Sequence, residues 1–179
     1  VAVGAMLAAG GSVVLREKFS ATAFWDDIAR WDCTIFQYIG ELCRYLLKAP
    51  GPTRPHSLRL AVGNGMNGDV WRAFQERFAI PHILEFYAAT EGNFSLYNVE
   101  GKPGSIGRIP PFLAHRFAAA LVQYDEAAGA PRRGADGLCI ACARGETGEA
   151  IGKIAAASRF EGYTDKNETE RRILRNVFA

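Results

Sequence analysis

Strand-like and helix-like runs alternate along the first half of the chain, and this rhythm limits the fold more than any other feature. Each short run of β-branched and aromatic residues is followed by apolar residues at helical spacing. The strand candidates are 12–15, 34–36, 58–62 and 83–87. They begin about 21 to 25 residues apart, which is the repeat length of β-α-β units. The pattern therefore predicts an α/β fold in which a parallel sheet has flanking helices.

Helix signals lie between these strand candidates. Ser20 can cap a helix in which Phe19 and Phe24 form a hydrophobic staple. Two further helices have apolar faces made by residues at helical spacing: Ile39, Leu42, Leu46 and Leu47, and then Val70, Phe74 and Phe78. The apolar run 1–9 is far shorter than the ~20 residues of a membrane span and lacks the basic start of a signal peptide. We expect it to form a buried helix.

The pattern changes after Asn93, where glycine and proline become frequent. The strand candidates here are 116–124, 137–143 and 149–155. They predict a β-rich, barrel-like segment or a meander, followed by a helix over 166–178. We therefore expect three parts, an α/β part, a β-rich part and a helical tail: 1–93, 94–158 and 159–179.

Composition and charge limit the function classes. The chain is 49% apolar and 22% charged, as in an average globular protein, and its net charge of +2 gives no reason to expect a nucleic-acid partner. Cys139 and Cys142 form a C-x-x-C pattern, but residues three apart on a strand point to opposite faces. Cys33 and Cys43 do not form a second pair with the spacing typical of metal ligands. We expect structural cysteines in a reducing, cytoplasmic compartment.

Polar and aromatic groups follow the fourth strand candidate. Tyr87 is followed by Thr90 and Glu91, and ligands of open α/β sheets bind at the ends of strands. A hydroxyl can bind a phosphate oxygen, a carboxylate can hold Mg²⁺, and an aromatic face can cover a base. The set suits a nucleoside phosphate, and a simple helix cap is the structural alternative.

The run 63–68 reads Gly-Asn-Gly-Met-Asn-Gly and matches the dinucleotide-binding pattern G-x-G-x-x-G. Glu85 lies toward the end of the next strand candidate, where an acid that binds ribose would lie. Two points count against NAD binding. At least two β-α units precede the run, although this pattern normally occupies the first one, and NAD binding leaves Thr90 and Glu91 unexplained. The alternative is a tight turn that lets the following helix pack close to the sheet.

Several segments together resemble the fatty acid transport protein/very-long-chain acyl-CoA synthetase family of adenylate-forming enzymes. The resembling segments are 13–20, 24–27, 37–46, 63–65, 69–71, 85–93 and 160–163. The most specific are the Tyr-Ile-Gly-Glu-Leu run from Tyr38 and the Tyr-x-x-Thr-Glu-Gly-Asn run from Tyr87. Ala88 stands where most of the superfamily has glycine, and the fatty acid transport branch tolerates alanine there.

The resemblance implies a two-step ligase reaction. A fatty acid carboxylate attacks the α-phosphate of ATP to give acyl-adenylate and pyrophosphate, and the thiol of coenzyme A then displaces AMP to give acyl-CoA. The implied ligands are ATP, Mg²⁺, coenzyme A and a fatty acid.

The resemblance also implies roles for particular residues. The resemblance assigns nucleotide binding to six residues: Gly63, Asn64, Gly65, Glu85, Phe86 and Tyr87. The glycine-lined backbone would form one wall of the adenine pocket, and Tyr87 would stack on the other face. Thr90 would bind the α-phosphate, and Glu91 would hold Mg²⁺. Tyr38, Gly40 and Glu41 would border an acyl tunnel from a helix over 38–45, with Gly40 leaving room for an alkyl chain.

The resemblance further implies that the chain corresponds to a central part of the family's large domain. A phosphate loop would lie upstream of Val1, and a Thr-Gly-Asp segment and a catalytic lysine would lie beyond Ala179. We therefore expect no turnover from these residues alone. Two alternatives stay open: a non-catalytic fatty acid uptake protein with peripheral membrane association, and, less favoured, an NAD-binding domain. The sequence carries no signal for an oligomeric state.

Overall fold

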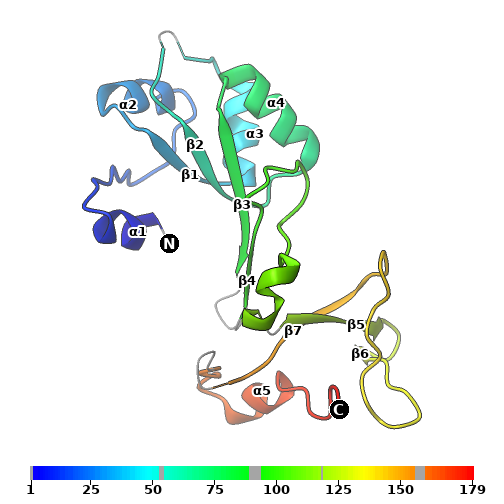
Figure 1. Cartoon of the computed structure of the whole chain (residues 1–179). Coiled ribbons are helices and arrows are strands. Elements are labelled where there is room, and N and C mark those ends of the chain that lie inside the picture. Colours follow the sequence, from blue (N-terminus) through cyan, green and yellow to red (C-terminus); the bar gives the residue numbers. More distant parts are fainter. Residues whose placement is uncertain (1, 53–54, 89–93, 118, 156–159) are drawn as a thin grey trace. The chain divides into compact units, whose positions relative to one another are not determined.

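The computed structural model describes residues 2–52, 55–88, 94–117, 119–155 and 160–179. The chain divides into two compact units (Figure 1). Unit 1 comprises Val1–Tyr87 and Leu96–Arg108, and unit 2 comprises Ala88–Ser95 and Ile109–Ala179.

Parallel strands form the centre of unit 1. The sheet has the order β1-β2-β3-β4, with bounds Ile35–Ile39, Leu60–Asn64, His82–Ala88 and Ser95–Tyr97. β1 pairs with β2 and β2 pairs with β3, both in parallel. The predicted α/β fold with parallel strands is therefore confirmed, because each crossover between these strands contains a helix.

Three helices accompany these strands, namely α2, α3 and α4, which span Phe24–Arg30, Gly40–Lys48 and Gly68–Phe78. α3 and α4 pack against each other (Figure 1). The Asn67 side chain caps α4 by accepting from Val70 N at 2.9 Å. The helix faces and the strands share one apolar core that includes Phe36, Tyr38, Cys43, Leu46, Ala61, Trp71, Phe74, Phe78 and Ile83.

An aromatic cluster joins α2 to α4. The Trp25 ring stacks on His56 with centroids 5.1 Å apart and lies 4.6 Å from the Phe78 ring. His56 also makes two hydrogen bonds. Its Nδ1 accepts from Leu58 N at 3.2 Å, and its Nε2 donates to the Phe78 carbonyl at 3.0 Å. This ring therefore connects the loop before β2 to the end of α4.

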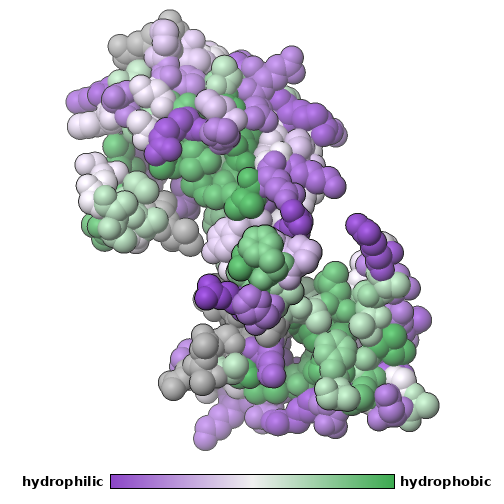
Figure 2. All heavy atoms as spheres, in the orientation of Figure 1, coloured by the Kyte–Doolittle hydropathy of each residue, from purple (hydrophilic) through white to green (hydrophobic). Residues whose placement is uncertain are grey.

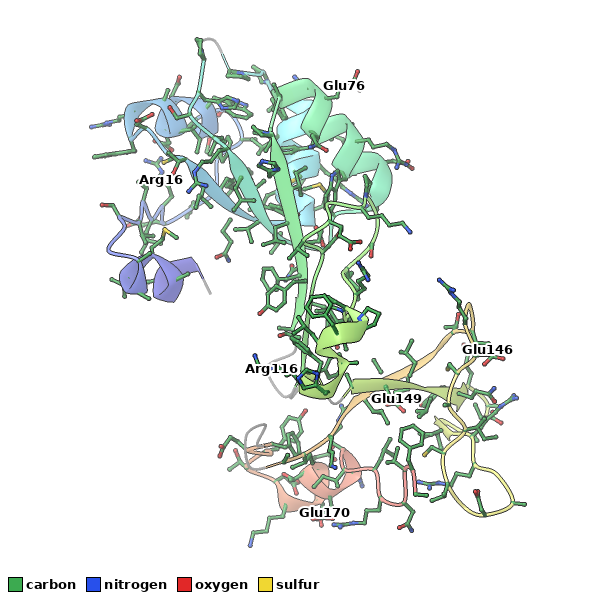
Figure 3. The ribbon with its side chains drawn as sticks, viewed as in Figure 1. Arg16, Glu76, Arg116, Glu146, Glu149 and Glu170 are labelled. Carbon is green, nitrogen blue, oxygen red and sulfur yellow. The ribbon has the colours of Figure 1, made fainter. Side chains whose placement is uncertain are left out.

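Two expectations for the N-terminal region are wrong. Residues 12–15 form no strand, and they belong to neither of the sheets among the described residues. The helix over 1–9 is present as α1 (Ala2–Ala8), but it is exposed rather than buried, with Leu7 73% exposed. The following segment contacts α2 through Arg16, which lies 3.4 Å from the Asp27 carboxylate (Figure 3).

The capping prediction at Ser20 is right in its contacts, but the helix begins later. Ser20 Oγ accepts from Ala23 N at 3.2 Å, and the Phe19 and Phe24 rings lie 6.3 Å apart. α2 begins at Phe24, after a turn over 21–23.

Unit 2 contains the β-rich segment. β5, β6 and β7 span Ala119–Asp125, Ala130–Pro131 and Gly148–Gly152, and they form an antiparallel sheet in the order β6-β5-β7. The described residues form an open sheet, and no closed barrel is found among them. The 3₁₀-helix η1 (Pro111–Arg116) occupies the start of the expected strand 116–124. The expected strand 137–143 makes only isolated bridges, at Cys139 and Ala141.

A carboxylate closes the turn before β7. Glu146 Oε2 accepts from Ala143 N at 2.6 Å and from Gln123 Nε2 at 3.1 Å. Both hydrogen bonds lower the pKa of Glu146, and the bond from the Ala143 backbone has the larger effect. Figure 3 labels Glu146 at this turn and Glu149 on β7.

The C-terminal helix is shorter than the expected 166–178, because α5 spans only Lys166–Arg171. The backbone beyond it is used in contacts with the β-rich segment. Cys139 N donates to the Val177 carbonyl at 2.9 Å, and Arg133 donates to the carbonyls of Arg175 and Asn176. Asn176 has φ of 53°, which interrupts a right-handed helix.

Exposed hydrophobic side chains occur on both units, and each unit has green surface in Figure 2. They include Leu7, Ile39, Val99, Phe112, Leu121 and Ile154. Within the described ranges, none of the helices has the length and apolar character needed to cross a bilayer.

We predict that His56→Ala lowers the free energy of unfolding by about 2 to 3 kcal/mol, because it removes two hydrogen bonds and a ring contact. Urea unfolding followed by tryptophan fluorescence measures this change. His82→Ala is the matched control, since His82 is exposed and its loss should change stability by about 0.5 kcal/mol or less. Equal effects of the two substitutions would contradict the role given to His56.

Candidate functional site

The carboxyl ends of the parallel strands bring two predicted segments together. Asn64 is the register partner of Ile39, and Gly63 is the register partner of Glu85. The glycine-containing segment after β2 therefore lies beside the end of β3, which carries Phe86 and Tyr87. This edge is where ligands bind in open parallel sheets.

Three residues form a row across β1, β2 and β3. Tyr38 pairs with Gly63, and Gly63 pairs with Glu85, so all three face the same side of the sheet. The Tyr38 hydroxyl donates to Glu85 Oε1 at 2.7 Å across the central strand. A Cβ built on Gly63 would lie 2.7 Å from Cδ2 of the Tyr38 ring. The glycine is therefore required because the tyrosine passes over it.

The loop after β2 is fixed from the core side. Met66 is buried, and its backbone N–H donates to Glu85 Oε1 at 3.0 Å. Gly65 has φ of +79°, a conformation that favours glycine. A Cβ on Gly40 would lie 1.9 Å from the Gly65 carbonyl oxygen, so α3 and the loop approach each other only because Gly40 has no side chain.

These contacts explain the glycine pattern without a dinucleotide. Glu85 is only 2% exposed and binds Tyr38 and Met66 inside unit 1. It therefore does not point outward as an acid that binds ribose would. Gly63 is needed because the Tyr38 ring packs over it, and Gly65 because its φ is positive. These roles agree with the alternative stated for this run, a tight turn without NAD.

Burial also sets the protonation of the neighbouring groups. Burial is the main cause that raises the pKa of Tyr38, followed by its hydrogen bond to Glu85. Burial likewise raises the pKa of the Cys43 thiol, and the charge of Glu85 raises it further. Tyr38 is therefore a hydrogen-bond donor at neutral pH, and Cys43 is a protonated thiol rather than a nucleophile.

Groups on the solvent side of this edge are available to a ligand. Asn64 and Gly65 are exposed, and the Tyr87 side chain is 37% exposed. Phe86 is half-buried, with its ring 6.4 Å from that of Tyr97. The arrangement offers an aromatic ring and an exposed glycine backbone, both of which suit the flat face of a base.

The surroundings of the residues expected to border an acyl tunnel differ from the prediction. Tyr38 lies in β1 rather than on a helix, and its side chain is 2% exposed. The space beside Gly40 is filled by the Gly65 backbone and does not admit an alkyl chain. Glu41 is exposed in the first turn of α3, with its carboxylate 3.8 Å from Arg44.

Sequence reasoning missed the role of Met66, whose backbone amide links the loop to Glu85. Its side chain is only 4% exposed, but a backbone donor leaves no signature in residue identity. The predicted phosphate and metal residues Thr90 and Glu91 lie outside the described residues. Among the residues that are described, no group of three His, Cys, Asp or Glu side chains could hold a metal ion.

The chain is similar to known proteins in both sequence and structure. The profile of the family described as AMP-binding enzyme matches residues 1–134. The chain is 46% identical to long-chain fatty acid transport protein 1 of Homo sapiens over 100% of its length, and 44% identical to long-chain fatty acid transport protein 2 of Rattus norvegicus over 94%. It spans 28% of the length of each of these relatives.

Solved structures show the same fold at lower identity. An ATP-bound RpMatB-BxBclM chimera matches 95% of this chain with a TM-score of 0.66 and 23% identity, over 31% of its own length. The O-succinylbenzoate coenzyme A synthetase of Bacillus subtilis, in complex with ATP and magnesium, matches 98% with a TM-score of 0.62 and 18% identity, over 34% of its own length.

We predict that Gly40→Ala destabilises the protein by about 3 kcal/mol, because the added methyl group collides with the Gly65 backbone. Gly4→Ala is the control, since Gly4 is also helical and a Cβ there has no atom within 4 Å. It should leave stability unchanged or raise it by up to about 1 kcal/mol. Urea midpoints of the two variants compare them, and a neutral Gly40→Ala would contradict the close approach of α3 to the loop.

Proposed function

We propose, since this chain belongs to the AMP-binding enzyme family, that the protein containing it is a fatty acyl-CoA synthetase. The family profile covers most of the chain, and the relatives of highest identity named above are long-chain fatty acid transport proteins. The observation that carries the proposal is the pairing of Gly63 with Glu85, because it sets the glycine-containing loop beside β3, the strand that carries Tyr87.

The proposed reaction has two steps. A fatty acid carboxylate oxygen attacks the α-phosphorus of ATP, and the bond to the pyrophosphate oxygen breaks, which leaves acyl-adenylate and pyrophosphate. The thiolate of coenzyme A then attacks the acyl carbon and displaces AMP, which leaves acyl-CoA. ATP, coenzyme A and a fatty acid are thus the proposed substrates, and long-chain acids are the proposed class.

The nucleotide roles rest on the resemblance and on the strand ends together. The backbone at Gly63, Asn64 and Gly65 forms one wall for adenine, and the Tyr87 ring covers the opposite face. Thr90 binds the α-phosphate. The Glu91 carboxylate is a hard oxygen ligand that suits Mg²⁺, which would offset charge on the departing pyrophosphate.

The acyl chain has a less defined place in the proposal. Tyr38 and Gly40 face the interior of unit 1, so neither would touch an alkyl chain, and Gly40 acts by letting α3 approach the loop after β2. Glu41 and Tyr45 lie on the exposed side of the same helix. We place the acyl path along that exposed side, where each buried CH₂ adds about 0.8 kcal/mol to binding.

A second candidate function is fatty acid uptake without catalysis. The relatives are named long-chain fatty acid transport proteins, which favours it. The two functions separate in cells that carry an inactive ligase variant. Uptake that continues after complete loss of acyl-adenylate formation favours transport, and uptake that stops with it favours the ligase.

We predict that Glu91→Ala lowers fatty-acid-dependent ATP–pyrophosphate exchange by roughly 100-fold or more, because a carboxylate beside the reacting phosphates is lost. The assay uses the protein encoded by the complete reading frame that contains these residues. Glu76→Ala is the control, since Glu76 is an exposed acid on the outer side of α4 (Figure 3). Exchange that is unchanged in Glu91→Ala would remove Glu91 from the mechanism.

A further inference from the structure

We propose that Glu85 is a positioning residue of this site: its buried carboxylate holds the glycine-lined wall from the core side and does not touch the nucleotide. The proposal rests on the proposed function, because it assigns the wall at 63–65 to adenine. It departs from the role that the family resemblance implied for Glu85, which was direct contact with the cofactor.

One oxygen atom connects three segments of unit 1. Glu85 Oε1 accepts from the Tyr38 hydroxyl of β1 at 2.7 Å and from the Met66 backbone N–H at 3.0 Å. On the other side of β3, the Glu85 carbonyl accepts from Asn98 N at 2.8 Å. The residue is 2% exposed, so these contacts lie beneath the surface that a ligand would meet.

The row across the sheet explains why these groups meet. Tyr38, Gly63 and Glu85 are register partners on adjacent strands. The tyrosine ring reaches the carboxylate only because Gly63 has no side chain. A buried carboxylate is costly unless donors surround it, and here the donors come from β1, two strands away, and from the loop after β2.

Loss of the carboxylate would release the loop on one side. The Met66 N–H would be buried without a partner, and a buried unpaired donor drives a local rearrangement. On the other side, Gly40 sets only a lower limit on how close the Gly65 backbone can come. The wall would therefore shift relative to Tyr87, which weakens nucleotide binding but leaves the reacting groups intact.

The experiment compares Glu85→Ala, Glu85→Gln and Tyr38→Phe in the protein from the complete reading frame. We expect Glu85→Ala to raise the KM for ATP about tenfold, the factor that corresponds to one charge-assisted hydrogen bond. The kcat at saturating ATP should change by less than about threefold. Glu85→Gln keeps an acceptor oxygen and should restore most of the affinity. Tyr38→Phe should raise the KM less than Glu85→Ala, because Met66 keeps its acceptor.

A second measurement separates positioning from direct contact. Inosine triphosphate lacks the 6-amino group of ATP, so its KM relative to that of ATP reports on recognition of the base edge. We expect this ratio to be the same in wild type and in Glu85→Gln. A ratio that changes in Glu85→Gln would mean that the carboxylate touches the base, and it would overturn the proposal.

A matched control separates positioning from loss of stability. Phe74 is fully buried in α4, and Phe74→Leu lowers stability without changing any residue of the row across the sheet. We expect Phe74→Leu to lower the melting temperature and to leave the KM for ATP unchanged. If Glu85→Ala also lowers only the melting temperature, Glu85 has a purely structural role and the proposal fails.

Hydrogen exchange at the Met66 amide and calorimetric binding of ATP keep this proposal distinct from the ligase function. Glu85→Ala should speed exchange at Met66 and weaken ATP binding together. If wild type binds ATP but shows no pyrophosphate exchange, the ligase proposal fails alone, and the dissociation constant then replaces the KM. If wild type binds no ATP, both proposals fail. Unchanged Met66 exchange in Glu85→Ala would overturn the positioning role alone.

Discussion

The rest of the site depends on the hydrogen bonds that the buried Glu85 carboxylate accepts. It joins β1 through Tyr38 and the loop after β2 through Met66, and it does so from β3. No local contact could make these connections, since Tyr38 and Glu85 are 47 positions apart in the chain. These contacts require the parallel register, because that register sets the tyrosine, the glycine and the carboxylate in one row.

Two glycines follow from this arrangement. Gly63 lies under the Tyr38 ring, and Gly40 faces the backbone of the loop. Together they let a strand, a helix and a loop approach more closely than side chains would permit. The run 63–68 therefore resembles a dinucleotide fingerprint for a physical reason. In a dinucleotide site the backbone must come close to the ligand, and here it must come close to a side chain or to another backbone segment. Glycine permits both kinds of approach because it has no side chain.

The sequence predicted the parts of the fold that local pattern controls. The parallel strands and α4 were predictable because apolar spacing follows burial on one face. The runs 12–15 and 137–143 have strand composition, but a regular strand also needs a continuous backbone partner, which composition does not encode. The helix after Lys166 ends at Arg171, and the carbonyls of Arg175 and Asn176 beyond it bind Arg133 from a distant segment, a contact that helical spacing does not reveal. At the candidate site, Gly63 and Glu85 could be named from the sequence but their contacts with Tyr38 could not, and the backbone donor at Met66 and the inward face of Gly40 also required coordinates.

A wall made of backbone needs an anchor that is separate from the ligand. Gly65 adopts a positive φ and is exposed, so this part of the loop gains little from packing of its own. If the nucleotide itself had to order it, part of the binding energy would be lost to that ordering. The bond from Met66 to Glu85 and the contact with Gly40 order the loop during folding instead. In the proposed function the exposed face of the loop would meet the base, while its buried face donates the Met66 N–H to the Glu85 carboxylate of β3.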